Sequence, residues 1–451
     1  MLIREAVSAM KGYHHISPTF QFALPVILES VLSTFINLVF SSLIGGISGS
    51  SLTTISQCNL AITLITAASM MLTTGSGILC ARLLGGGEMR EASRIVEQTL
   101  FLSLVSSLVI TGVCLVFTQP LMAILMPNAQ SDVLSEGVAY FRVLILSLPF
   151  LMLTSTLVSV LRASGDSRSP MFINVFTCVL QLLFAFLLLR VLALDIIGAG
   201  LTFLLCRLGG ALLAFYVLLH SHRYAALSLR KALHPHLPTF RRILAVGIPT
   251  SVESIFVQAG YLMGSSMVIG LGTFEAAVYN VANTLYSFAS LPQGILSTIA
   301  LTISGQLIGA KAYAQAKKTG WHIWMTGMAS MLAMSIILLL ARTHLTPLYS
   351  ADPAVQSAAA DAILFALLMN PPGTSLNTLD PQLRAGGDVK FVMTTTIIAV
   401  WLIRLPLTYF FCYHWTWGAS GVFLANAISL FFRMVCNMAR FIQGKYLYMR
   451  V

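Results

Sequence analysis

Long apolar segments dominate the chain and follow one another at short intervals. A helix that crosses a lipid bilayer needs about 20 mostly apolar residues, and the sequence offers twelve such segments. They lie at residues 20–43, 55–80, 98–118, 138–160, 170–190, 196–219, 243–269, 278–303, 320–341, 357–379, 391–413 and 418–440. The pattern predicts an all-α polytopic membrane protein with 12 transmembrane helices. We expect the first segment to be retained as a transmembrane helix and not to be cleaved as a signal peptide.

The composition agrees with this prediction. Of the 451 residues, 57% are hydrophobic and only 9% are charged, whereas soluble domains carry about 25% charged residues. The chain therefore lacks the polar side chains that would cover a soluble surface of this size. The seven cysteines are scattered in or beside apolar segments without a CxxC pair. We interpret them as small buried residues and not as a disulfide framework or metal site.

Lysine and arginine predict the orientation in the membrane. Of the 26 basic residues, 20 lie at the chain ends and in alternate connections, and only Arg190 and Arg342 lie in the opposite connections. Because basic residues favour cytoplasmic loops, we expect a cell (inner) membrane protein with both termini cytoplasmic. This distribution accounts for the net charge of +11 without a nucleic-acid partner. The basic stretch 220–242 predicts a cytoplasmic linker between an N-terminal lobe, 1–219, and a C-terminal lobe, 243–451.

The two lobes repeat one another. At one constant shift in numbering, polar and special residues of the first lobe coincide with identical residues of the second, among them Pro25 with Pro249, Glu29 with Glu253, Asn59 with Asn283 and Gly85 with Gly309. At a shift that is two positions shorter, the segment LRASGD at 161–166 coincides with LRAGGD at 383–388. Six spans, an even number, separate the copies, which therefore share one orientation. Such parallel repeats are typical of secondary transporters with a substrate site at the repeat interface.

Two carboxylates inside predicted spans are candidate ion-coupling residues. Glu29 and Glu253 each follow a proline by four residues, and counting at 1.5 Å per residue places both about 15 Å deep, near the bilayer midplane. A proline kinks a helix, and an intramembrane acid is a functional candidate because its burial is costly. The alternative is structural: each Glu only satisfies neighbouring hydroxyls and the backbone groups that the proline frees.

Other polar residues of the spans are candidates for substrate contact. We assign this role to Asn37, Asn59, Gln258, Tyr261, Asn283, Tyr286 and Arg404, although hydrogen bonding between helices explains any single one equally simply. Arg404 and Arg433 both need a partner inside the membrane. Glu253 is the nearest unpaired acid of the same lobe, which predicts an ion pair there. For Arg433, the alternative is that its side chain reaches the cytoplasmic interface.

The two LRA-x-GD boxes are interpreted as architecture. Their glycines allow sharp turns, and Asp166 and Asp388 can cap the helices that follow. Arg162 and Arg384 are expected to anchor at the lipid headgroups. Signatures of enzymes (HExxH, GxSxG, a Walker A loop) are not found in the sequence. We predict no catalytic residue, metal site or cofactor, and only H⁺ or Na⁺ as a coupling ion.

The chain resembles the multidrug and toxic compound extrusion (MATE) transporters over nearly its whole length. The resemblance rests on the prolines of the first and seventh spans, the GQLIGA segment at 305–310 with its basic loop, and both LRA-x-GD boxes. It implies a cation-coupled antiporter whose two lobes form a V-shaped cleft. Such a protein exports amphipathic, often cationic small molecules by alternating access, and the sequence gives no sign of an obligate protein partner.

One position departs from the family pattern. The family commonly carries an aspartate where this chain has Phe40, in the segment FSSLIG. If the ion site of the N-terminal lobe needs that carboxylate, Glu29 takes over its role or the site is missing. Coupling through Glu253 in the C-terminal lobe is then favoured.

Three other classes of membrane protein are alternatives to this resemblance. A lipid-linked oligosaccharide flippase of the same superfamily is the main one, although few basic residues lie within the spans. A major-facilitator transporter would carry a Gly-x-x-x-Asp-Arg box after the second span, which the stretch 82–88 lacks. A membrane enzyme or a structural protein is the weakest interpretation.

Overall fold

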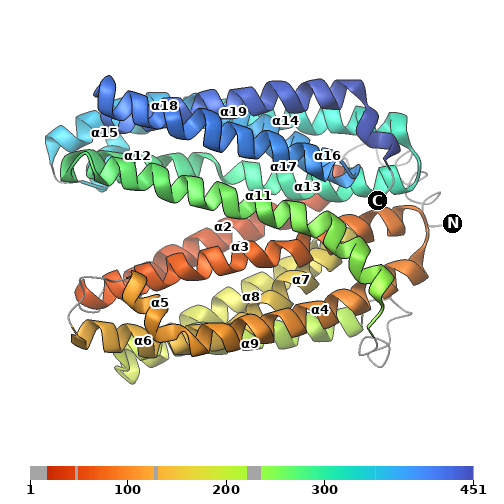
Figure 1. The fold of residues 1–451 in the computed structure, drawn as a ribbon, viewed down its shortest axis with the longest axis horizontal. Helices are drawn as coiled ribbons and strands as arrows, with labels where there is room; N and C mark the ends of the chain where they lie inside the picture. The colour runs from red at the N-terminus through yellow and green to blue at the C-terminus, as the bar shows by residue number, and fades with distance from the viewer. Residues whose placement is uncertain (1–17, 46–48, 126–130, 221–234, 351, 450–451) are drawn as a thin grey trace. The chain divides into compact units, whose positions relative to one another are not determined.

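The structure is a computed structural model that describes residues 18–45, 49–125, 131–220, 235–350 and 352–449. Helices make up most of this part of the chain, and it contains no β-strand. The chain divides into two compact units, Met1–Gly247 and Ile248–Val451, each a bundle of packed helices (Figure 1). The predicted linker falls largely on 221–234, outside the described residues, so the boundaries of the lobes stay a prediction.

The first unit contains the first six predicted segments, all of them helical. Its elements are α2 (Pro18–Gly45), α3 (Gly49–Gly85), α4 (Met89–Val116), α5 (Thr118–Leu125), α6 (Ser131–Leu146), α7 (Leu148–Ala163), α8 (Arg168–Ala185), the π-helix η1 (Phe186–Val191) and α9 (Asp195–Leu219). The predicted span 138–160 is therefore two helices. They meet at Ser147, whose hydroxyl donates to the Leu144 carbonyl at 2.6 Å.

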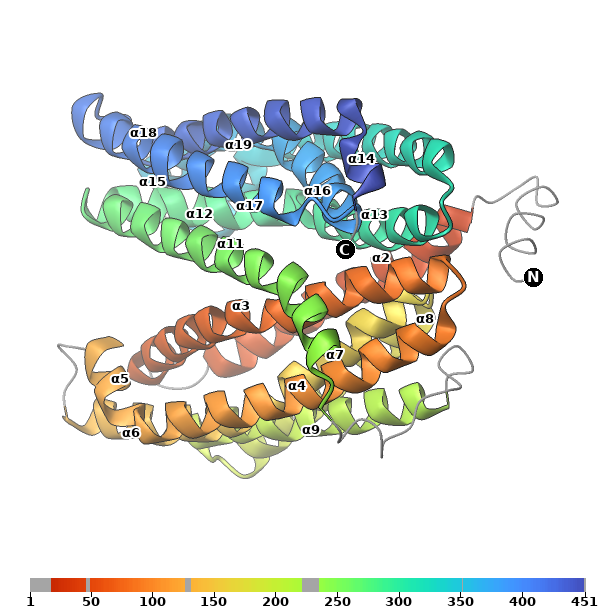
Figure 2. The ribbon, with the colours of Figure 1, turned by 45° about the vertical axis from the view of Figure 1, so that its right-hand side comes forward.

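The second unit holds the other six segments, which are also helical. Its elements are α11 (Leu237–Ile269, which begins in the first unit), α12 (Thr273–Ala289), α13 (Leu291–Gly309), α14 (Tyr313–Leu345), η3 (Thr346–Leu348), α15 (Pro353–Leu367), α16 (Asn370–Ala385), α17 (Val389–Ile397), η4 (Ile398–Arg404), α18 (Leu405–Tyr409), η5 (Phe410–His414), α19 (Gly418–Gln443) and η6 (Lys445–Tyr448). In Figure 2, α17 runs beside α11.

Several of these elements continue into one another and together are long enough to cross a membrane. By length and composition, ten described helical stretches meet this criterion, among them α6 with α7 and α17 through η5, and the pair α15 and α16, bent by 42°, makes an eleventh. The remaining predicted span is α2, in which 24–37 counts as a shorter apolar helix. The predicted fold class, an all-helical multi-pass membrane protein, is confirmed.

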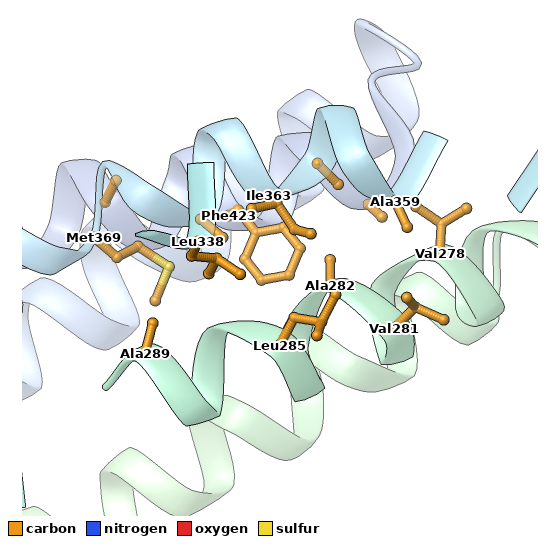
Figure 3. Close-up of a cluster of buried hydrophobic side chains, with 14 of the residues drawn as sticks. Val278, Val281, Ala282, Leu285, Ala289, Leu338, Ala359, Ile363, Met369 and Phe423 are labelled. Carbon is orange, nitrogen blue, oxygen red and sulfur yellow. The ribbon is translucent and has the colours of Figure 1, made fainter. Parts of the chain in front are cut away.

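Small residues let the helices of the second unit pack closely. A buried cluster joins α12, α15 and α19, with alanines such as Ala282 and Ala359 facing larger side chains such as Leu285, Ile363 and Phe423 (Figure 3). Helix association in lipid depends on such close packing, because lipid tails are as apolar as the side chains that face them.

The internal repeat extends to unusual backbone geometry. Gly165 and Gly387, the glycines before the aspartates of the two LRA-x-GD boxes, both have positive φ, +82° and +96°. Gly87 and Lys311, which are related by the same shift as the two glutamates, both have positive φ as well, +79° and +57°. Glycine adopts this conformation freely, so the sharp turns expected at the boxes are confirmed.

Candidate functional site

Glu253 lies at the centre of a charged cluster in the second unit. It is 4% exposed on α11. Arg384 of α16 donates from Nη2 to both carboxylate oxygens, at 2.9 and 2.8 Å. The Thr396 hydroxyl of α17 donates to Oε1 at 2.7 Å, and Arg433 of α19 lies 3.5 Å from the same oxygen. Side chains from three helices therefore hold this carboxylate.

A second carboxylate extends the cluster. Asp380 of α16 accepts from Arg433 Nη2 at 2.7 Å and from the Asn437 side chain. Asp380 and Arg384 stand four residues apart on one helix, which places them on the same face. The cluster therefore holds two acids and two arginines, with a net charge of zero. Neutrality matters because an unpaired buried charge costs several kcal/mol.

The first unit contains a smaller version of this cluster. Arg162 Nη2 donates to Glu29 Oε1 at 2.5 Å, and the Asn174 amide donates to the same oxygen at 2.6 Å. The other carboxylate oxygen of Glu29 and the Nε of Arg162 are buried with no hydrogen-bond partner among the described residues.

The two clusters occupy equivalent positions of the repeat. The glutamates coincide at the longer of the two shifts, whereas the arginines coincide at the shorter one, as do Asn174 and Thr396. The sequence contained a signal for these two hydrogen-bond donors, because Asn174 and Thr396 are related by the same shift as the boxes. We missed it because the two residues are of different types. Asp380 has no counterpart, because Val158 stands at the equivalent position.

The structure corrects the interpretation of the two boxes. Arg162 and Arg384 were expected at the headgroups, but each pairs with the buried glutamate of its own unit. Asp166 does cap the next helix, accepting from the Arg168 and Ser169 amides at 3.0 and 3.1 Å. Asp388 does not cap, because it accepts from Arg440 Nε at 2.5 Å instead.

The partners of Glu253 lie close to the turn that joins α16 to α17. Thr396 is seven residues into α17, which corresponds to about 10 Å from the start of that helix. Arg384 lies in the last turn of α16. The depth of Glu253 in the bilayer stays a prediction.

The two arginines inside the eleventh and twelfth spans behave differently. The predicted ion pair with Glu253 is confirmed for Arg433, which also pairs with Asp380. It is wrong for Arg404, whose guanidinium carbon lies 4.0 Å from the centre of the Tyr261 ring. Arg404 is 2% exposed and ends the π-helix η4, an element that often occurs at functional sites.

Of the seven predicted substrate residues, the described structure brings only Tyr261 and Arg404 into contact. Three asparagines, Asn37, Asn59 and Asn283, are exposed on their helices, and Gln258 is half-buried on α11. Tyr286 packs against the hydrophobic cluster of the second unit. Substrate contact stays a prediction for all seven.

Phe40, the departure from the family pattern, belongs to the core of the first unit. It is 5% exposed and meets Phe203 edge to face, with ring centres 5.2 Å apart. On α9, Arg207 lies over the same Phe203 ring and donates to the Ser147 hydroxyl at 2.6 Å. An aromatic contact therefore occupies the place where the family commonly has a carboxylate.

The bent pair α15 and α16 carries an unusually polar helix. Asn370, Thr374 and Gln382 of α16 are fully buried, and the Asn377 amide donates to Gln293 Oε1 at 3.0 Å. Buried polar atoms without a described partner remain at Gln293, Asn370 and Gln382. Ordered water commonly satisfies such groups. Within the described residues, no group of three or more His, Cys, Asp or Glu side chains is suited to hold a metal ion.

Comparison with known proteins gives consistent matches. A family model described as MatE matches residues 25–187 and 249–410, once in each half of the repeat. The chain is 24% identical over 417 residues to the uncharacterized transporter YisQ of Bacillus subtilis, covering 90% of both chains. It is 21% identical to a probable multidrug resistance protein NorM of Thermotoga maritima, covering 94% of this chain and 92% of that one. A crystal structure of a MATE protein in complex with MaD3S superimposes with a TM-score of 0.86 at 19% identity, covering 95% of each chain.

Proposed function

The chain belongs to the MatE family of membrane transporters, and on that premise we propose that it is a secondary antiporter. It exchanges H⁺ or Na⁺ for amphipathic, cationic drugs or toxic metabolites by alternating access. The relatives named as multidrug resistance proteins support export of this kind. The distribution of lysine and arginine supports an inner-membrane protein with both termini in the cytoplasm.

The observation that carries the proposal is the duplicated carboxylate and guanidinium cluster. Each glutamate already has a cation, its own arginine. A proton or Na⁺ that binds to Glu253 therefore competes with Arg384 for the same two oxygens. Because the cluster is neutral, an added cation leaves one positive charge in excess, which separation of the helices relieves.

The helices that would separate are those that the cluster joins. Pro249 lies within α11, one turn before Glu253, and a proline weakens the helix there. Binding of the coupling ion would free α11 from α16, and a cationic substrate would compete for the same carboxylate. Substrate and ion would then bind alternately, which is the requirement for exchange.

The first test uses purified protein in liposomes. The movement of an ethidium-type dye is followed under an imposed pH gradient and then under a Na⁺ gradient, for the wild type and Glu253→Gln. Glu275→Gln is the matched control, since Glu275 is an acid of the same unit that, within the described part of the chain, accepts only from the Ala419 amide, at 2.7 Å. We expect gradient-driven movement in the wild type and the control but not in Glu253→Gln. Equal movement in all three would refute coupling at Glu253.

A lipid-linked oligosaccharide flippase is the second candidate. One observation favours it: Arg404 is a buried cation without an acidic partner among the described residues, and a lipid pyrophosphate would supply one. Folded protein that moves dye with neither ion, but moves a lipid-linked oligosaccharide between leaflets, would favour this alternative.

A further inference from the structure

Arg404 is the cation that the ion pairs within the predicted spans of the second unit leave without an acidic partner among the described residues. The three acids of the two clusters, Glu29, Glu253 and Asp380, are each paired with an arginine other than Arg404. Among the described residues, Arg404 has neither an ion pair nor a hydrogen bond to its side chain, and its Nε is buried without a partner. One positive charge therefore lies uncompensated in the interior of the second unit.

The stacking contact with Tyr261 does not compensate this charge. The attraction between a cation and an aromatic ring is smaller than the cost of removing a guanidinium from water, even after the protein relaxes. A bound oxyanion would close the difference, because charge-assisted hydrogen bonds between a guanidinium and a carboxylate or phosphate are among the strongest in proteins.

The helices around Arg404 approach closely and then leave room. A Cβ on Gly260 would lie 2.3 Å from Val400 Cγ1, so α11 and η4 touch there. One turn later, a Cβ on Gly264 would meet only the Arg404 Nη2, at 3.6 Å. Within 4 Å, the place of a side chain at position 264 is therefore bordered by the guanidinium alone, whose own neighbour is the Tyr261 ring. The π-helix η4 widens the turn just before Pro406, as helices in membranes do to accommodate proline.

Partly exposed aromatic side chains of α11 and η4 offer an apolar surface. Tyr261 is 41% exposed although Arg404 stacks on it. About one turn along, Phe256 meets Trp401 edge to face, with ring centres 5.5 Å apart, and is 37% exposed. An amphiphile could place its apolar body on these rings and its charged end at Arg404.

We propose that Arg404 and Tyr261 form a subsite for the carboxylate or phosphate of an amphiphile. The substrate range then includes anionic and zwitterionic compounds, an inference that rests on the proposed function as an exporter. Tyr261 is eight residues beyond Glu253 on α11, which is about 12 Å along the helix. A zwitterion of that length could place its anion at Arg404 and its cation at Glu253.

The subsite is confined to the second unit. At the repeat shifts, Leu182 stands in place of Arg404 and Asn37 in place of Tyr261. Leu182 packs against the hydrophobic core of the first unit. The two clusters around the glutamates are thus shared by both units, whereas the anion subsite is not.

The test compares pyrenebutyrate with its uncharged methyl ester, in binding to the full chain in uncharged detergent micelles. Pyrene fluorescence anisotropy reports both affinities without an ion gradient. We expect the wild type to bind the acid at least about tenfold more tightly than the ester, since a hydrogen bond to a charged group contributes about 1.5–3 kcal/mol. R404Q should abolish this preference, because it weakens binding of the acid more than binding of the ester.

The matched control is R207Q, because Arg207 also lies over an aromatic ring, that of Phe203, but in the first unit. It should keep the preference for the acid. If R404Q does not fold, G264L tests the same point by filling the space beside the guanidinium, and it should weaken binding of the acid. An acid-to-ester ratio that R404Q and G264L leave unchanged would overturn the proposal.

Added phosphatidylglycerol then distinguishes a lipid phosphate from a soluble anion. Displacement of pyrenebutyrate from the wild type identifies a lipid headgroup as the ligand, and retention identifies a soluble amphiphile. Both outcomes support an oxyanion subsite only together with loss of the acid preference in R404Q.

The binding assay and the transport assay also distinguish the subsite from the antiporter. If the acid is not preferred but dye is exported, only the subsite is refuted. If the acid is preferred but dye is not exported, only the antiporter is refuted.

Discussion

Replacing Arg384 with glutamine should destabilise the protein through its effect on a single buried acid. Arg384 contacts both oxygens of Glu253, at 2.9 and 2.8 Å. Without it, Glu253 keeps the Thr396 hydroxyl and the more distant Arg433, which already serves Asp380. The net charge of the cluster changes from zero to −1.

The magnitude follows from burial. Removing one partner of a buried ion pair costs about 3–5 kcal/mol. The Arg384 side chain is 23% exposed and Glu253 keeps a second cation, so we expect about 3 kcal/mol, the lower end of that range. Glu253→Gln should cost a similar amount because it leaves a cation in excess. The double variant should be no less stable than either single one, which gives a coupling free energy of about 3 kcal/mol.

The assay is a double-mutant cycle on the free energy of unfolding, measured by SDS titration in mixed micelles with tryptophan fluorescence. Glu91 and Arg94 are the control pair, since they are 3.8 Å apart and their side chains are 46% and 45% exposed. Their coupling should be at most about 0.5 kcal/mol. A coupling below about 1 kcal/mol between Glu253 and Arg384 would refute the buried cluster, because exposed pairs reach that value.

Three further predictions test other parts of the structure. Phe423→Ala should lower the free energy of unfolding by about 3–5 kcal/mol, because the side chain is 2% exposed in the cluster of α12, α15 and α19; a loss under about 1 kcal/mol in the SDS titration would contradict this packing. Gly387→Ala should lower the free energy of unfolding by about 1–2 kcal/mol because the φ of Gly387 is +96°. Its control, Gly112→Ala, should be neutral or stabilising, because nothing lies within 4 Å of the added Cβ. Equal losses of unfolding free energy in the two variants would argue against a strained turn. Thr396→Val and Asn174→Leu should each cost about 1.5–3 kcal/mol by removing a hydrogen bond to a carboxylate; melting temperatures equal to the wild type would show that neither donor matters.

The duplicated cluster links a proline-containing helix to a loop in each unit. The glutamate is carried by a helix with an internal proline, and its arginine stands in the last turn before the sharp turn of an LRA-x-GD box. In the proposed exchange, an ion that neutralises the glutamate acts on both elements at once. The arginine at the end of the helix therefore takes a direct part in the proposed exchange.

The fold could be predicted from the sequence because its cause is local. Twelve apolar segments must be helical in lipid, where every backbone group needs an internal partner, and the structure has a helix in each one. The repeat could be predicted as well, from identical prolines, glutamates and boxes at a nearly constant shift. These inferences need no knowledge of which helix packs against which.

The site depended on information that the sequence does not carry. Glu253 is paired with Arg384, 131 residues later, and Arg433 with Asp380, 53 residues earlier. Counting residues predicted an ion pair of Arg404 with Glu253, which in the structure is a partner of Arg433. The error arose because the position of a residue in a span does not reveal which way its side chain faces. Counting also placed Arg162 and Arg384 at the headgroups, since a helix-end arginine can reach either outward to lipid or inward to an acid.

Hydrophobicity and repetition are properties of the chain alone, so they suffice to identify a twice-repeated helical membrane protein. Which charges neutralise one another depends on how the helices pack. A buried charge must find its counter-charge within a few ångströms, and that distance is set by the packing of several helices. Within the spans of the second unit, Arg404 could therefore be recognised as a cation without a described acidic partner only after Glu253 and Asp380 were seen to be paired with others.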